Sequence, residues 1–332
     1  MDMAVHVIMT FLSLLLILLS CTIFVNAVEQ AGEKLNLHQG IIGSILAAVG
    51  TALPETIIPI IAILFTSGEN AHDIGIGAIA GAPFMLGTLA FFITGLSVIV
   101  YTLLGKRKIT MNADPALVFK DLLFFIIVYG VAVLTTFIHH GVFRIVIAVF
   151  LLLSYGLYLK ITIDKVSEQN GVVEELYFMR FLKLPDNLFW ILAQLFLGLF
   201  MIILGAHLFI GYVEKLSFAF GVAPLILSII ITPIATEMPE KVNSIIWVGR
   251  QKDTLAMGNI TGAMVFQGCF PVVFGIVFTP WNLMGTTMVS AILAFMSAFL
   301  VLTWVKIFKS LNAFILLVGG LLYISFLVYV FS

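Results

Sequence analysis

Long apolar stretches separated by short polar segments follow one another along the whole chain, and they constrain the fold more than any other feature. A helix that crosses a hydrocarbon layer needs roughly 20 predominantly apolar residues. Ten stretches reach that length, with approximate limits 4–27, 39–66, 74–102, 119–138, 142–163, 188–213, 221–249, 253–279, 285–308 and 311–331. Strands of a membrane barrel alternate apolar and polar residues, whereas a stretch such as Leu122 to Leu134 is apolar on every face. The sequence therefore predicts an all-α integral membrane protein with ten transmembrane helices.

Composition excludes a water-soluble class. Soluble domains take roughly half of their residues from apolar types, but apolar residues make up 62% of this chain and charged residues only 10%. The two cysteines, Cys21 and Cys269, both lie in apolar stretches, so neither a disulfide framework nor a thiolate metal cluster is expected. The surroundings are therefore expected to be the lipid bilayer, and redox chemistry is not indicated.

Lysine and arginine residues predict the orientation, because short loops that carry them stay on the cytoplasmic side. The clearest such loop is Lys106-Arg107-Lys108. Placing it inside also puts most other basic residues at the inner side, namely Lys34, Lys120, Lys160, Lys165, Arg180, Lys183, Arg250, Lys252, Lys306 and Lys309. Arg144 and Lys215 are then outside, both termini face outward, and the plasma membrane is the expected host. Topology thus explains the basic loops, and no nucleic-acid partner is expected.

Two similar motifs divide the chain into halves. The second apolar stretch contains Gly50-Thr51-Ala52-Leu53-Pro54-Glu55, and the seventh contains Ala235-Thr236-Glu237-Met238-Pro239-Glu240. Each is followed by a glycine-rich helix start, Gly77 to Ala82 in one half and Gly258 to Ala263 in the other. We predict a first repeat of residues 1–163, a cytoplasmic linker of residues 164–187 and a second repeat of residues 188–332. Because each half holds five helices, the second half must enter the membrane from the opposite side, which makes the repeats inverted.

Both motifs place a carboxylate beside a proline within an apolar stretch. Inverted repeats with broken helices at corresponding positions indicate a substrate site near the middle of the membrane. Pro54 and Pro239 lack a backbone N–H, so each frees a carbonyl oxygen about one turn earlier. An ionisable residue inside a membrane is costly and is by default a functional candidate. We therefore interpret Glu55 and Glu240 as one cation site to which each half contributes a carboxylate.

Hydroxyl groups accompany the two carboxylates. Thr51 precedes Glu55 by four residues, and Thr236 stands four residues before the second glutamate, so each hydroxyl lies on the helix face of its carboxylate. Ca²⁺ takes about six to eight oxygen ligands, which two carboxylates, hydroxyls, freed carbonyls and water can supply. A divalent cation, in particular Ca²⁺, is the expected substrate.

Plainer explanations remain for these features. Glu55 and Glu240 could line aqueous vestibules, or neighbouring groups could hold them protonated for packing. The glycines four residues apart in each helix start have the spacing that lets helices approach closely, and we interpret them first as packing residues.

The two motifs, each followed by Gly-x-x-x-Gly, resemble the alpha repeats of the calcium/cation antiporter superfamily, which includes the sodium/calcium exchangers. The resemblance covers the length, the ten-helix plan and both repeats, and it is strongest at Gly258-Asn259-Ile260-Thr261-Gly262. It implies that the Thr and Glu of each motif provide Ca²⁺ ligands, which are Thr51, Glu55, Thr236 and Glu240. It also implies a role for Asn259, because the family has an asparagine directly after the first glycine.

The chain departs from the family pattern at several ligand positions. Family members commonly have serine at four positions that here are Ala52, Ala82, Glu237 and Ala263. They commonly have Asn or Asp where this chain has Leu86 and Gln267. The resemblance thus makes Glu237 and Gln267 further candidate ligands, while several sodium ligands are missing.

Charged residues crowd the second motif. Glu237 and Glu240 stand three residues apart and share a helix face. Two carboxylates in a poorly hydrated site resist simultaneous ionisation, so the pair can hold a proton when no cation is bound. Protons are therefore the expected counter-ion. The alternative is that Glu237 pairs with Lys241 in an aqueous vestibule and that sodium binds elsewhere.

The sequence thus predicts a secondary active transporter that exchanges a divalent cation against protons or Na⁺ by alternating access. A cation channel or a passive cation-binding membrane protein remains the alternative. The apolar stretches contain neither a convincing Ser-His pair nor two mid-membrane aspartates, so an intramembrane enzyme is not indicated. We expect inorganic cations as ligands, no resident cofactor and a functional monomer.

Overall fold

The computed structural model describes residues 3–34, 53–66, 69–163, 175–185 and 187–332. Thr51 and the first part of the second apolar stretch lie outside these residues. Some side chains around the second motif, including that of Glu240, also lie outside the described part, although their backbone belongs to it.

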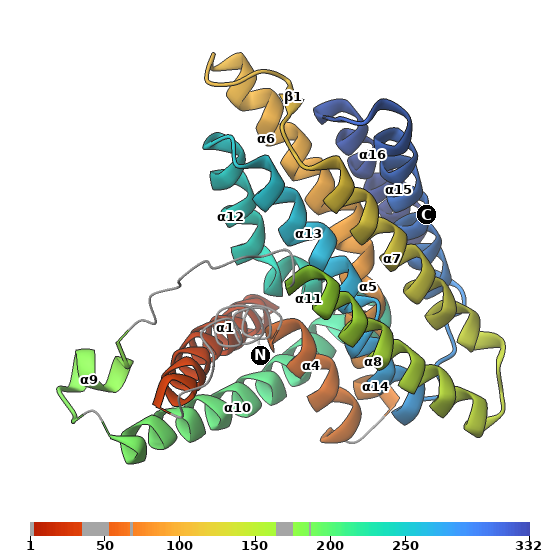
Figure 1. Cartoon of the computed structure of the whole chain (residues 1–332). Coiled ribbons are helices and arrows are strands. Elements are labelled where there is room, and N and C mark those ends of the chain that lie inside the picture. Colours follow the sequence, from red (N-terminus) through yellow and green to blue (C-terminus); the bar gives the residue numbers. More distant parts are fainter. Residues whose placement is uncertain (1–2, 35–52, 67–68, 164–174, 186) are drawn as a thin grey trace.

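Helices make up almost all of the described chain (Figure 1). Before the linker these are α1 (Met3–Lys34), α4 (Leu53–Leu64), α5 (Glu69–Met85), the π-helical turn η2 (Leu86–Ala90), α6 (Phe91–Leu103), α7 (Pro115–Leu134), the 3₁₀ turn η3 (Thr135–Phe137) and α8 (Gly141–Ile163). Next come the short α9 (Tyr177–Leu182), then α10 (Leu188–Phe220), α11 (Pro224–Thr236), α12 (Met238–Gly249), α13 (Asp253–Gln267), α14 (Phe270–Phe278), α15 (Thr286–Phe308) and α16 (Ala313–Phe331). Two short strands, β1 (Thr110–Met111) and β2 (Leu311–Asn312), pair antiparallel.

Eight helical segments among the described residues are long and apolar enough to span a membrane. They are Met3–Ala31, Asn70–Leu103, Pro115–Phe137, Gly141–Thr162, Leu188–Phe220, Asp253–Phe278, Thr286–Phe308 and Ala313–Phe331. Two apolar helices are shorter, Pro54–Leu64 and Pro224–Ile234. The predicted class, an all-helical integral membrane protein, is thereby confirmed.

The predicted seventh span, 221–249, is not one continuous helix. Helix α11 ends at Thr236 and α12 begins at Met238, while Glu237 between them has φ −92° and ψ 3°. Pro239 lies in the first turn of α12, where its missing N–H leaves no helical bond unmade. The eighth span also divides, into α13 and α14 at Gly268 and Cys269. This second break was not predicted from the sequence.

Two apolar cores meet at α5 and α11. The larger core is built mainly from α6, α7, α13, α15 and α16. The smaller one joins α1, α4 and α10. Residues of α5 and α11 belong to both cores, so the end of α11 and the following break lie inside the molecule rather than on a lipid-facing side.

Helices α5 and α11 approach closely through two glycines. A Cβ atom at Gly77 would lie 2.6 Å from the backbone carbonyl oxygen of Leu225, and one at Gly81 would lie 2.5 Å from that of Ile229. No side chain fits at such distances without moving the α11 backbone. These two glycines are therefore packing residues, as predicted, and they fix α11 directly ahead of the break.

Helices α1 and α10 lie along each other on one side of the molecule (Figure 1), and α9 contacts both. The backbone N–H of Tyr177 donates to Asn26 Oδ1 at 3.0 Å, and that of Phe178 donates to Gln194 Oε1 at 2.8 Å. Part of the predicted linker is thus packed against α1 and α10.

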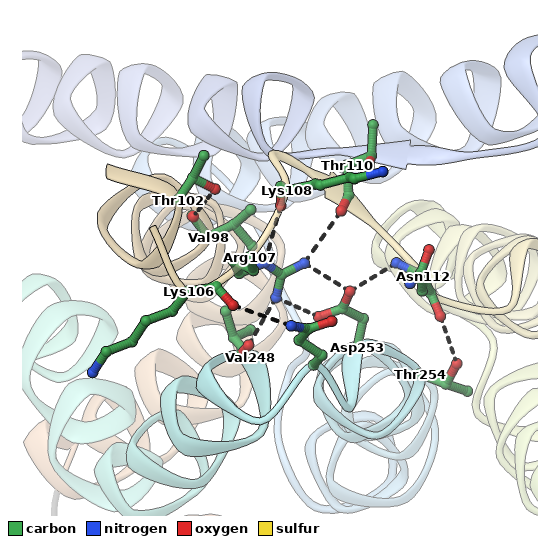
Figure 2. Close-up of polar contacts among 11 residues, drawn as sticks. Val98, Thr102, Lys106, Arg107, Lys108, Thr110, Asn112, Val248, Asp253 and Thr254 are labelled. Atoms are coloured by element: carbon green, nitrogen blue, oxygen red, sulfur yellow. Dashed lines mark hydrogen bonds and ion pairs between the residues drawn. The ribbon is translucent and has the colours of Figure 1, made fainter. Parts of the chain in front are cut away.

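A buried ion pair holds one end of the molecule together (Figure 2). Arg107 Nη1 and Nη2 lie 2.7 and 2.8 Å from the two carboxylate oxygens of Asp253. Nη1 also donates to the carbonyl of Val248 at 2.8 Å, and the backbone N–H of Asn112 donates to Asp253 at 2.7 Å. Because both side chains are almost fully buried, the pair fixes the loop after α6 against the turn between α12 and α13.

Candidate cation site

The first motif contributes a buried carboxylate at a helix start. Glu55 lies in the first turn of α4, and its side chain is only 6% exposed, like that of the neighbouring Thr56. The N-terminus of a helix carries a partial positive charge that stabilises a carboxylate. Glu55 is therefore a carboxyl group buried inside an apolar bundle, at a position where a helix N-terminus favours its charged form.

The second motif contributes a row of hydroxyl groups on α11. Thr236 is 1% exposed, and its Oγ1 donates to the carbonyl of Thr232 at 3.0 Å, so the hydroxyl oxygen keeps lone pairs for another ligand. One turn earlier, Thr232 Oγ1 lies 3.1 Å from Ser228 Oγ. Ser228 Oγ in turn donates to the carbonyl of Ile74 on α5 at 2.6 Å. The hydroxyl row therefore faces the bundle interior.

An ion pair occupies the break itself. Glu237 follows Thr236 directly, and Lys241 Nζ donates a hydrogen bond to Glu237 Oε2. The side chains of Lys241 and Glu237 are 4% and 3% exposed. The alternative with sodium as the counter-ion predicted that Glu237 pairs with Lys241 in an aqueous vestibule. The pair is present, but it is buried. The Lys241 ammonium offsets the charge of Glu237, which weakens the argument that Glu237 must share a proton with Glu240.

Helix α13 brings a further polar group inward. Gln267 is the last residue of α13 and is 3% exposed, and its Oε1 makes no hydrogen bond with any described residue. The same holds for the buried Oγ of Ser244 on α12. Buried polar atoms usually have a partner, so both oxygens are candidates for ligand contacts. Asn259, earlier on α13, is half-buried.

The described structure brings together part of the predicted site. Glu237 directly follows Thr236 and pairs with Lys241, and α4, which carries Glu55, contacts both α5 and α11. Thr51 lies outside the described residues, and Glu240 lies in the first turn of α12 with its side chain outside the described part. Among the described residues, no three His, Cys, Asp or Glu side chains are grouped as they would be around a metal ion. Joint coordination by the two motif glutamates stays a prediction.

A further buried carboxylate, Asp121 on α7, was not among the candidate residues predicted from the sequence. Tyr158 Oη donates to Asp121 Oδ1 at 3.1 Å, and Thr261 Oγ1 donates to Oδ2 at 2.8 Å. Lys120 Nζ lies 3.4 Å from Oδ1. The carboxylate thus joins α7 to α8 and α13. An aspartate inside the apolar stretch 119–138 was a visible signal, but its partners come from other helices.

Buried carboxylates and hydroxyls at a helix break, inside a bundle of apolar helices, are features of a membrane protein that transports cations. The sodium/calcium exchanger protein family matches this chain over residues 5–163 and 190–332. The chain belongs to this family, which confirms the resemblance to the calcium/cation antiporter superfamily. The family is one of exchangers.

Two individual membrane proteins are similar to this chain in sequence. The chain is 25% identical over 259 residues to the uncharacterized membrane protein MJ0091 of Methanocaldococcus jannaschii, covering 76% of each chain. It is 24% identical over 256 residues to the inner membrane protein YrbG of Escherichia coli, covering 76% of this chain and 74% of that protein.

Two solved structures have a similar fold. The H⁺/Ca²⁺ exchanger CAX superposes with a TM-score of 0.69 at 13% identity, over 98% of this chain and 86% of that one. The sodium-calcium exchanger NCX_Mj superposes with a TM-score of 0.56 at 21% identity, over 98% of this chain and 99% of that one. At these identities the likeness shows the fold alone.

Proposed function

We propose that this protein is a secondary active transporter that exchanges Ca²⁺ against protons by alternating access, with Na⁺ as the alternative counter-ion and without a resident cofactor. The observation that carries the proposal is that both motif glutamates fall in the first turn of a helix, Glu55 in α4 and Glu240 in α12. Membership of an exchanger family supports transport of inorganic cations.

The proposed transporter has ten transmembrane helices in two inverted five-helix repeats, residues 1–163 and 188–332, joined by the linker 164–187. The family matches in two segments, 5–163 and 190–332, which nearly coincide with these halves. The helix contacts also support it, because α4 packs on α5 and α14, whereas α12 packs on α13 and α6. Such an exchange of partners is what a two-fold axis in the membrane plane produces.

We propose that the end holding the Arg107–Asp253 pair faces the cytoplasm. Gln251 Nε2 donates to the carbonyl of Lys106 at 3.1 Å, and β1 pairs with β2, so three loops meet there. These loops carry many of the basic residues, Lys106, Arg107, Lys108, Arg250, Lys252 and Lys309, as expected for an inner side. Both termini are then outside, in a monomer of the plasma membrane.

The charge of the proposed site supports Ca²⁺ as the substrate, and the residue types at the family's sodium-ligand positions support protons as the counter-ion. The charge of Glu237 is offset by Lys241, so the two motif glutamates leave two negative charges, which match one divalent cation. Carboxylate, hydroxyl and carbonyl oxygens are ligands that Ca²⁺ prefers. Four positions that resemble sodium-ligand positions of the family hold apolar residues, Ala52, Ala82, Leu86 and Ala263, which supports protons over Na⁺.

Flux into liposomes that contain the purified protein tests the proposal. An imposed pH gradient, acidic inside, should drive Ca²⁺ uptake without Na⁺. Glu55→Gln and Glu240→Gln should each lower that uptake on the order of a hundredfold, because each removes one charge from a low-dielectric site. Normal uptake by both variants would contradict the site, and uptake driven only by a Na⁺ gradient would contradict proton coupling. Labelled Ca²⁺ should exchange against unlabelled Ca²⁺, since a channel only dissipates a gradient.

A further inference from the structure

We infer that the ammonium group of Lys241 is a tethered cation, which permanently fills one cation position of the transport site. The protein would then bind one divalent cation with no monovalent cation beside it. This inference rests on the proposed function, and it assigns to Lys241 a role in setting which ions the site accepts.

The geometry at the break carries the inference. Lysine side chains in membrane helices usually extend toward the interface, where the ammonium group is hydrated. Lys241 does not, because its side chain is 4% exposed and donates to Glu237 Oε2. Lys241 lies eight residues before the end of α12 at Gly249, about 12 Å along the helix axis. The ammonium group is therefore held inside the protein by Glu237.

The pair belongs to the same break as the predicted ligands. Glu237 stands between the buried Thr236 and the first turn of α12, three residues before Glu240. A buried carboxylate in such a place requires a compensating positive charge. An ammonium group is a compact positive charge with three hydrogen-bond donors. It can therefore stabilise carboxylate oxygens as a small bound monovalent cation would.

Counting charges gives the consequence for ion binding. In the proposed site, Glu55, Glu237 and Glu240 in their charged forms together with Lys241 give three negative charges and one positive charge, which leaves two negative charges for one divalent cation. Without the lysine, three negative charges would face that divalent cation. The remaining charge is costly in a poorly hydrated site, so a small monovalent cation should bind beside Glu237.

Direct Na⁺ binding tests the inference on the full-length protein in detergent, with saturating Ca²⁺ and N-methyl-D-glucamine holding the ionic strength constant. Wild type should bind Ca²⁺ and no saturable Na⁺. Lys241→Met should bind about one labelled Na⁺ per chain, and Na⁺ should raise its melting temperature. The double variant Glu237→Gln/Lys241→Met should lose this Na⁺ binding, because its net charge is again that of the wild type. Lys306→Met, at an exposed lysine, is the matched control and should behave as wild type.

A second comparison keeps the inference testable if Lys241→Met fails to fold. Glu237→Gln alone leaves the lysine charge unpaired and should weaken Ca²⁺ binding on the order of tenfold or more, and adding Lys241→Met should restore it. A merely structural pair predicts lower stability in both single variants with unchanged Ca²⁺ affinity, and that result would overturn the inference. So would a folded Lys241→Met that binds no Na⁺. If wild type itself binds no Ca²⁺, the proposed function fails instead.

Discussion

Three ion pairs join buried acidic side chains to basic ones in the described part of the chain, Asp253 with Arg107, Glu237 with Lys241 and Asp121 with Lys120. Where both partners are almost fully buried, as in the pairs of Asp253 and Glu237, removing one partner leaves an uncompensated charge and costs about 3–5 kcal/mol, far more than at a surface. Arg107 and Asp253 connect loops, and Asp121 connects helices. Only the pair at Glu237 lies at the break, which is why single substitutions there should change ion binding as well as stability.

Asp121→Asn should destabilise the protein by about 2–3 kcal/mol. The carboxylate accepts hydrogen bonds from Tyr158 and Thr261 and lies 3.4 Å from the Lys120 ammonium group, whereas an amide offers a single acceptor oxygen. Thermal unfolding in detergent measures the loss. Tyr158→Phe, which removes one donor, should cost about 1 kcal/mol. An unchanged melting temperature for Asp121→Asn would contradict the described network.

At the scale of helices, close packing of α5 on α11 positions the break. Gly77 and Gly81 leave one side of α5 without side chains, so the α11 backbone can approach. The hydrogen bond from Ser228 Oγ to the Ile74 carbonyl adds a polar contact between the two helices. Gly258 and Gly262, the matching residues of α13, have more room among the described residues, with nearest atoms 3.1 and 3.4 Å from a Cβ. The two glycine pairs are thus similar in sequence, but in the described structure the glycines of α5 are packed more tightly than those of α13.

Gly81→Ala should destabilise the protein by about 1–3 kcal/mol and reduce transport. Its Cβ would lie 2.5 Å from the Ile229 carbonyl oxygen and 2.9 Å from Pro233 Cγ, and overpacking of this kind forces helices apart. Gly156→Ala is the matched control, because apart from the adjoining backbone of its own helix no described atom lies within 4 Å of its Cβ and alanine favours a helix. Melting temperatures and Ca²⁺ flux of the two variants provide the comparison. Equal behaviour would mean that the α5–α11 contact does not position the site.

At the scale of the whole molecule, large apolar side chains cover much of the outer surface. Examples from several helices are more than half exposed, among them Phe143, Leu153, Phe200, Phe299 and Leu321. On a soluble protein such a surface would be an aggregation hazard, but in a bilayer it faces lipid. The polar network of Arg107 and Asp253, shown in Figure 2, joins loops that connect these helices.

Cysteine labelling in intact cells checks the proposed orientation. Native Cys21 and Cys269 are buried, so they contribute little background. Glu175→Cys, in the linker, should react with an impermeant maleimide only after the membrane is opened, while His140→Cys, in the turn between η3 and α8, should react from outside. Both native residues are exposed. The reverse pattern would invert the orientation, and reaction of both from one side would contradict the arrangement of the helices.

The amino-acid sequence was sufficient for the class of protein and the family, and it named candidate ligands that stay predictions. Apolar runs indicate membrane helices because a hydrocarbon layer requires them locally, and a carboxylate beside proline, as at Glu55, is unusual enough to mark a site. The spacing of Thr236 and Glu240 predicted a shared helix face, but α11 ends at Thr236 and Glu240 belongs to α12, so that part stays a prediction. Such features are properties of one segment, so they need no knowledge of its neighbours.

Only the tertiary structure decided which of the possible charge pairs form and that the eighth span also breaks, at Gly268 and Cys269. Arg107 is a loop residue by its sequence, yet it is buried against Asp253, which is 146 residues away. Asp121 meets Thr261 across 140 residues. Even Lys241, one turn from Glu237, could have pointed to solvent, and it is the packing around the break that turns it inward. Charge pairing depends on which helices become neighbours, and that choice results from the packing of the whole bundle.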